Sequence, residues 1–125
     1  MNAIPQNLQA DARILSALTL AIATHCTGLE ADAVDDALAS AAIELAERVE
    51  GDVIDLPTET AVRLADITGP LLACLHATRD ASDEAERGSC ETRSGLLSSR
   101  CRWLQFLSRD LAKQLATELE QEAKA

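Results

Sequence analysis

Histidine and cysteine are the residues with which this chain could bind a metal ion. The chain has six of them: His25, Cys26, Cys74, His76, Cys90 and Cys101. His25 adjoins Cys26, and His76 follows Cys74 by two positions, but helical neighbours at these spacings point about 100° and 200° away from each other. Neither pair can therefore chelate one ion, and no C-x-x-C or H-x-x-x-H spacing occurs. The sequence predicts no metal and no cofactor, with a Cys/His metal- or ligand-binding bundle as an alternative.

Covalent catalysis would need a nucleophile, a base and an acid that orients the base. Ser98, Ser99, His76 and Asp66 could supply these groups, but no nucleophile-elbow sequence surrounds the two serines. Glycine-rich phosphate loops are also missing from the sequence. The sequence therefore predicts a protein that is not an enzyme.

The charge of the chain indicates which kinds of partner it can attract. Its 21 acidic residues against 11 basic residues give a formal net charge of -10, which opposes direct binding to nucleic acid or to an anionic membrane. We expect a protein partner with a basic surface. Arginine outnumbers lysine by nine to two and alanine is abundant, which favours a bacterial source.

The apolar run at 14–23 is the only segment that resembles a signal peptide. It lacks a basic n-region, is preceded by Asp11, and is far shorter than the roughly 20 residues of a membrane-spanning helix. We therefore expect a cytoplasmic protein with reduced cysteines.

Leucine, isoleucine, valine and alanine recur at helical spacing along most of the chain. The pattern predicts helices over about 5–26 and 30–50, with Gly51 as the stop of the second. A third helix begins near Pro57 and continues past Gly69 and Pro70, where the missing amide of proline predicts a kink. Residues 80–92 are polar without an apolar stripe and predict a loop, and a fourth helix follows over about 93–122.

These elements predict an all-α fold, a mostly antiparallel bundle of four long helices in one domain over residues 1–125. At about 1.5 Å per residue, the fourth helix should overhang its shorter neighbours. The expected core consists of Leu15, Leu18, Ile22, Val34, Leu38, Leu45, Leu64, Ile67, Leu71, Leu75, Leu104, Leu111 and Leu115.

An acidic face is expected on the second helix, opposite its core stripe. A helical projection places five residues there: Asp32, Asp36, Ile43, Glu47 and Glu50. Ile43 amid these carboxylates could anchor a partner, although single exposed apolar residues are ordinary on protein surfaces.

A basic and aromatic face is expected on the last helix, opposite its leucines. Its members are Arg102, Phe106, Arg109 and Lys113. Residues 92–113 hold five bases and one acid, whereas residues 30–66 hold eleven acids and two bases. Aromatic and arginine side chains often dominate protein interfaces. Three uses fit this face: packing on the acidic face within one molecule, the same contact across a homodimer, or a contact with another protein.

The sequence thus predicts a small, acidic, non-enzymatic interaction protein that binds or covers a partner surface, as an inhibitor, adaptor or chaperone. The alternative is a nucleic-acid mimic that occupies the basic groove of a nucleic-acid-binding protein, in the manner of phage or plasmid anti-defence proteins. Steep weakening by salt would distinguish the mimic from an apolar interface.

Overall fold

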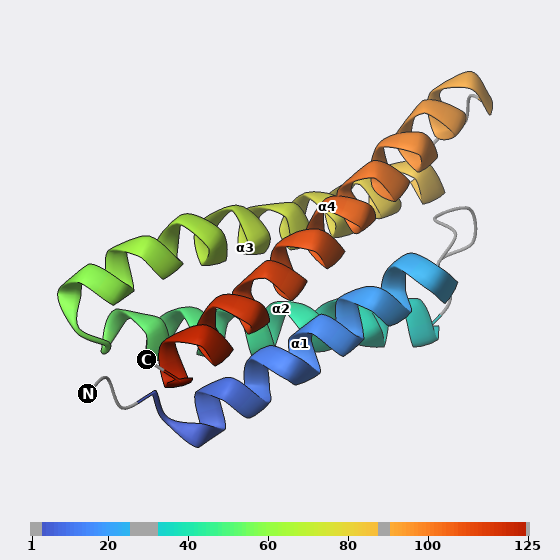
Figure 1. The fold of residues 1–125 in the computed structure, drawn as a ribbon. Coiled ribbons are helices and arrows are strands. Elements are labelled where there is room, and N and C mark those ends of the chain that lie inside the picture. The colour runs from blue at the N-terminus through green and yellow to red at the C-terminus, as the bar shows by residue number, and fades with distance from the viewer. Residues whose placement is uncertain (1–3, 26–32, 88–90, 125) are drawn as a thin grey trace.

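The computed structural model describes residues 4–25, 33–87 and 91–124, with side chains throughout except at 25, 33–36, 81–87, 91–99 and 101. The elements are four helices: α1 over Gln6–His25, α2 over Ala33–Ile54, α3 over Thr58–Arg87 and α4 over Glu91–Lys124. No strand occurs within the described ranges. Successive helices run in opposite directions, so both ends of the chain lie at the same end of the molecule (Figure 1). The predicted all-α antiparallel bundle is confirmed.

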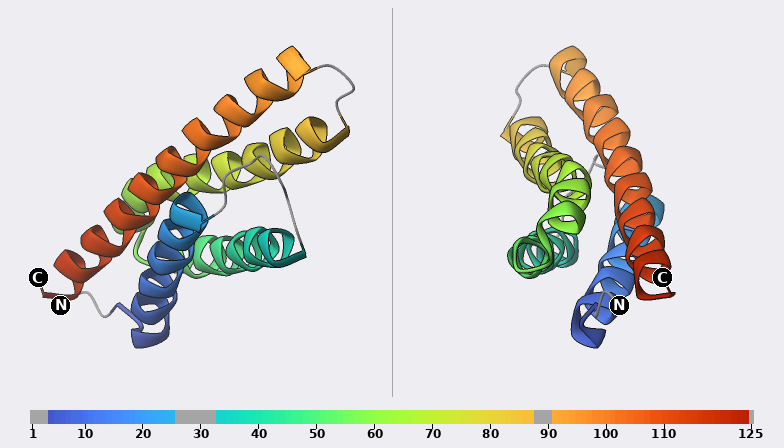
Figure 2. Two further views of the ribbon diagram at one scale, coloured as in Figure 1. Left: turned by 90° about the vertical axis from the view of Figure 1, so that its right-hand side faces the viewer. Right: turned by 60° about the vertical axis from the view of Figure 1, so that its left-hand side comes forward.

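Each helix packs against two others. α1 contacts α2 and α4, while α3 contacts the same two helices from the opposite side. The diagonal pairs, α1 with α3 and α2 with α4, make no contacts within the described part of the chain. The bundle is therefore square in cross-section, as Figure 2 shows from two sides.

The α3–α4 pair is longer than the α1–α2 pair. α3 has 30 residues and α4 has 34, against 20 and 22 for α1 and α2. The outer ends of α3 and α4 project together beyond α1 and α2, so the predicted overhang involves a helical hairpin (Figure 1).

The predicted loop over 80–92 is wrong at 80–87 and 91–92, because α3 continues to Arg87 and α4 begins at Glu91; residues 88–90 lie outside the described residues. Residues 80–87 lack an apolar stripe, which argues against a buried helix, but their alanines, glutamates and arginine favour helix formation in water.

α2 also continues beyond its predicted end. It passes through Gly51 and ends at Ile54. Val53 and Leu56 are buried, so packing in this region outweighs the low helix propensity of glycine. A three-residue link follows, and the amide of Ala61 donates to the carbonyl of Pro57 at 2.9 Å, at the predicted start of α3.

α3 passes through Pro70 as one helix, as the sequence predicted. Proline has no amide hydrogen, so the carbonyl of Asp66 lacks its usual helical donor. Both Gly69 and Pro70 are exposed, which leaves that carbonyl near solvent. Thr68, just before them, is buried, and its Oγ1 makes no hydrogen bond in the described structure.

Most of the predicted core is buried. The predicted members that are buried are Leu15, Ile22, Leu45, Leu64, Ile67, Leu71, Leu75 and Leu115. Leu18, Leu38 and Leu111 pack partly buried against this cluster, and Leu104 is half-buried. The side chain of Val34 lies outside the described residues.

α4 is rotated relative to its predicted orientation. Gln105, Ser108 and Ala112 are buried, whereas Leu107 is 37% exposed. Ser108 can be buried because its Oγ donates to the carbonyl of Leu104 at 2.9 Å. Small or hydrogen-bonded side chains therefore take the place of leucine on part of the core side of α4. An orientation of α4 predicted from its leucines alone is wrong for this reason.

Candidate interaction surfaces

The predicted basic and aromatic face lies at the contact between α4 and α1. Phe106 is half-buried, with the guanidinium carbons of Arg102 and Arg109 at 4.8 and 5.1 Å from its ring centroid. Arg102 Nη1 donates to the carbonyl of Ala23 at 2.9 Å. The carbonyls in the last turn of a helix lack intrahelical donors, and a cation is favourable there. Arg102 therefore caps α1, while Lys113, the last member of the face, is exposed.

One of the three uses considered for the face was packing on the acidic face of the second helix within one molecule. The contact observed among the described residues is instead between Arg102 and the end of α1, and α2 and α4 make no contacts there. The other two uses, a homodimer contact and a contact with another protein, stay predictions.

The predicted acidic face does not contain an exposed apolar anchor. Ile43 is only 4% exposed, so its predicted exposure is wrong. It lies on the side of α2 that meets α3, where Glu47 Oε1 of the next turn lies 3.7 Å from His76 Nε2 of α3. Glu47 is exposed and Glu50 is half-buried.

Two further members of this face, Asp32 and the side chain of Asp36, lie outside the described residues.

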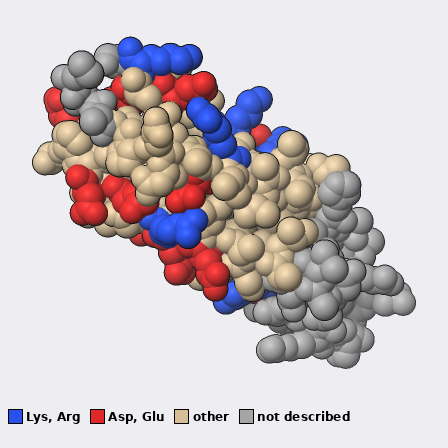
Figure 3. Space-filling view, turned by 90° about the horizontal axis from the view of Figure 1, so that it is seen from below, with Lys and Arg blue, Asp and Glu red and all other residues tan. Residues whose placement is uncertain are grey.

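An exposed apolar surface instead covers the outer side of α1. Ile14 is 52% exposed and Leu20 is 53% exposed, although both are large hydrophobic residues. Next to Ile14, a hollow of ≈ 260 Å³ opens between α1 and α2, and its apolar wall is formed by Leu18, Ala41 and Leu45. We call Ile14, Leu18, Ala41 and Leu45 the α1–α2 surface; Leu20 lies about 120° away from Ile14 around α1. Figure 3 shows this side of the bundle as a broad area without charged side chains, with acidic and basic side chains beside it.

Charged side chains form the edge of the hollow. Glu44 and Arg48 line it from α2. Arg48 donates two hydrogen bonds to the carboxylate of Asp11 on α1, each 3.0 Å long. Because both oxygens of Asp11 accept, this bidentate pair fixes the spacing of α1 and α2 beside the apolar wall.

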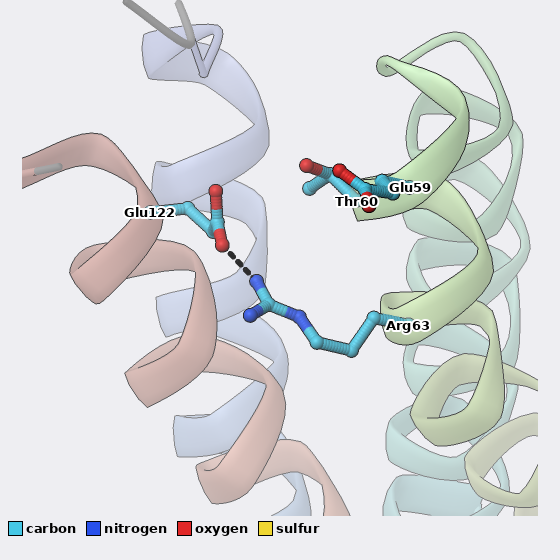
Figure 4. Close-up of a pocket in the computed structure, with 4 residues that line it drawn as sticks. All are labelled: Glu59, Thr60, Arg63 and Glu122. Carbon is cyan, nitrogen blue, oxygen red and sulfur yellow. Dashed lines mark hydrogen bonds and ion pairs between the residues drawn. The ribbon is translucent and has the colours of Figure 1, made fainter.

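A second hollow, of ≈ 340 Å³, lies between the start of α3 and the end of α4 and is polar. Glu59, Thr60, Arg63 and Glu122 line it. Figure 4 shows Arg63 reaching from α3 to form an ion pair with Glu122 of α4. The pair joins the two helices near the chain terminus, and no large apolar side chain lines this hollow. This hollow is therefore better suited to holding α4 against α3 than to binding a partner protein.

Metal ligands do not converge in the described part of the chain. No group of three His, Cys, Asp or Glu side chains there could hold an ion. Burial raises the pKa of the Cys74 thiol above its ordinary value of 9.0. The other members of the predicted alternative, His25, Cys26, Cys90 and Cys101, have side chains outside the described residues.

Within the described ranges, none of the helices combines the length and the apolar character that crossing a bilayer requires.

The relationship of this chain to known proteins was sought at three levels. No family model matches it. Neither a curated protein nor a solved structure is significantly similar to it.

The sequence contained one signal of the α1–α2 surface. Ile14, Ala17 and Ala21 widen the apolar stripe of the first helix beyond the arc that one core can cover. Ile14 and Ala17 are exposed, and Ala21 is half-buried. Leu20 lies outside the stripe altogether, so its position on a helix already places it toward solvent.

Proposed function

We propose that this protein is a non-enzymatic binding protein whose α1–α2 surface captures an amphipathic helix of a basic partner protein. The observation that carries the proposal is the exposure of Ile14 beside a hollow with an apolar wall. Contiguous exposed apolar surface of this kind is typical of protein interaction sites. An inhibitor, an adaptor and a chaperone would each act by binding a partner helix in this way.

The size of the hollow favours a protein side chain as its occupant. At ≈ 260 Å³ it is smaller than pockets for drug-sized ligands, which occupy about 300 to 1,000 Å³. Two antiparallel helices form its walls, an arrangement that accepts the apolar face of a third helix with anchors at i, i+3, i+4 and i+7. One large anchor in the hollow, with its neighbours on the same face of the partner helix against Ile14 and Leu18, would satisfy this spacing.

Charge complementarity specifies the rest of the partner helix. α1 and α2 together hold seven acidic residues and two basic residues. Acidic surroundings attract a basic segment and accelerate its association, while the apolar contacts hold it in place. The partner segment should therefore have lysine or arginine on the positions that flank its apolar face.

Peptide binding tests this proposal. The probe is a synthetic helix of leucine and lysine in which leucine occupies the i, i+3, i+4 and i+7 positions, titrated by calorimetry. A lysine and alanine helix of equal charge tests the apolar anchors, and a leucine and glutamate helix tests the charge. We expect binding of the first helix only.

Matched variants of the protein locate the contact. Ile14→Asp should weaken binding of the leucine and lysine helix by about tenfold or more, because a carboxylate replaces an apolar contact. Val62→Asp is the control, since Val62 is 62% exposed on α3, away from the α1–α2 surface. Far-UV circular dichroism should show both variants folded.

Two outcomes would overturn the proposal. One is equal weakening by the two variants. The other is equal affinity for the lysine and alanine helix with a steep loss between about 50 and 200 mM salt, which would favour the nucleic-acid mimic.

A further inference from the structure

A second exposed surface lies on α4, on the side that faces away from the core. Trp103 is 66% exposed, and Leu107, one turn later, is 37% exposed. Arg100 precedes this pair by three residues and Asp110 follows it by three, and both are exposed. At about 100° per residue, these four positions lie within an arc of about 80°. We call them the α4 outer stripe.

The α4 outer stripe is complementary to itself when it is reversed. Along the chain it has the order base, aromatic, aliphatic, acid, with spacings of three, four and three residues. An antiparallel copy therefore places Trp103 against Leu107 and Arg100 against Asp110, and each contact occurs twice. This symmetry is the requirement for a two-fold dimer, in which one patch contacts its own copy.

We propose that two copies of this chain associate through antiparallel packing of their α4 helices along this stripe. The two-fold axis passes between Trp103 and Leu107, at the level of Gln105. Dimerisation covers two tryptophans and two leucines that the single chain leaves in water. The inference uses α4 alone and does not depend on the α1–α2 surface.

The geometry of Asp110 leaves room for the contact with a second chain. Both Nε and Nη2 of Arg109 donate to the same oxygen, Oδ1, at 3.2 and 3.1 Å. The other oxygen, Oδ2, accepts no hydrogen bond among the described residues. It is therefore available to a guanidinium group of the second copy, and Arg100 is the base that antiparallel packing brings to it.

Tryptophan fluorescence reports this dimer directly, because Trp103 is the single tryptophan and the chain has no tyrosine. Analytical ultracentrifugation of the full chain over a range of concentrations should show a reversible dimer. The emission of Trp103 should shift to shorter wavelength over the same range. Leu107→Asp should abolish both changes, whereas Val62→Asp, at an exposed site on α3, should preserve them.

Charge reversal distinguishes this arrangement from other dimers. Arg100→Asp places two carboxylates together at each of the two symmetric contacts, and Asp110→Arg places two guanidinium groups there. Each single variant should raise the dimer dissociation constant by about tenfold or more, and the double variant should restore it to near the wild-type value.

Failure of the double variant to recover would overturn the antiparallel register. A monomeric wild-type protein at every concentration, or a dimer with unchanged Trp103 emission, would overturn the interface itself. None of these outcomes bears on peptide capture by α1 and α2, which is measured separately with Ile14→Asp.

Discussion

Replacing Ile43 or Ile14 by alanine deletes the same three carbon atoms from two opposite environments. Ile43 is buried between α2 and α3, whereas Ile14 is half exposed on α1. The two substitutions therefore form a matched pair, in which one residue is the control for the other. They also test the correction of the sequence prediction, which placed Ile43 on the surface.

The expected losses of stability follow from the burial of each side chain. Three fully buried carbons contribute about 2.4 kcal/mol at about 0.8 kcal/mol each. The cavity left in a packed core increases the loss, so Ile43→Ala should lower the free energy of unfolding by about 2 to 5 kcal/mol. Because Ile14 is about half exposed, Ile14→Ala should lose only about half of the 2.4 kcal/mol expected for fully buried carbons. The higher helix propensity of alanine offsets part of that, and the net loss should be below about 1 kcal/mol.

Urea denaturation followed by far-UV circular dichroism measures both values by linear extrapolation. The slopes with denaturant should be unchanged, so that the midpoints alone report stability. A loss below about 1 kcal/mol for Ile43→Ala would refute the packing of α2 against α3. An equal loss for the two variants would refute the exposure of Ile14, on which the proposed function depends.

Two further predictions concern a buried hydroxyl and a partly buried thiol of α3. Thr68→Val replaces a buried hydroxyl that has no hydrogen-bond partner with a methyl group of similar shape. Urea denaturation should therefore show an unchanged free energy of unfolding or a gain of about 1 kcal/mol. A loss above about 1 kcal/mol would mean that the hydroxyl has a partner. The raised folded-state pKa of Cys74 gives a contribution to stability that is present below pH 9.0 and is lost as the pH rises through the folded pKa. The urea midpoint should therefore fall between about pH 8 and pH 10 more steeply for the wild type than for Cys74→Ala, and parallel curves would contradict the burial of this thiol.

The number, order and direction of the helices could be predicted from the sequence because these depend on periodic apolar residues and short links. The continuation of α3 past Pro70 followed from the apolar stripe on both sides of the proline, which includes Ile67 and Leu71. These residues are buried as predicted, so the local pattern and the tertiary packing agree in this helix.

The orientation of α4 could not be predicted in the same way. A periodic stripe gives the average direction of the apolar side chains, but the core position is decided by which side chains fit between α1 and α3. Ser108 and Gln105 fit there because they are small or hydrogen-bonded, and Arg102 finds a carbonyl acceptor on α1. Such partners lie 79 residues apart in the sequence and leave no local pattern.

Prediction of the candidate surfaces from the sequence erred in two ways: some residues predicted to be exposed are buried, and some exposed residues were missed. The predicted basic and aromatic face lies partly inside the bundle, and the predicted anchor Ile43 lies in the core. The exposed position of Leu20 follows from the helical pattern of α1, whereas the exposure of Ile14 on α1 and of Leu107 on α4 became visible only when the neighbours of each helix were known. The exposed side of a helix therefore cannot be predicted from that helix alone, because the neighbouring helices decide which of its sides they cover.

The most direct test of partner capture is methyl NMR of the protein during titration with the leucine and lysine helix. We predict that the methyl signals of Ile14, Leu18 and Leu45 shift together, while those of Val62 and Leu107 remain in place. Shifts centred on Leu107, or binding without any shift of Ile14 and Leu18, would contradict the assignment of the binding site to α1 and α2.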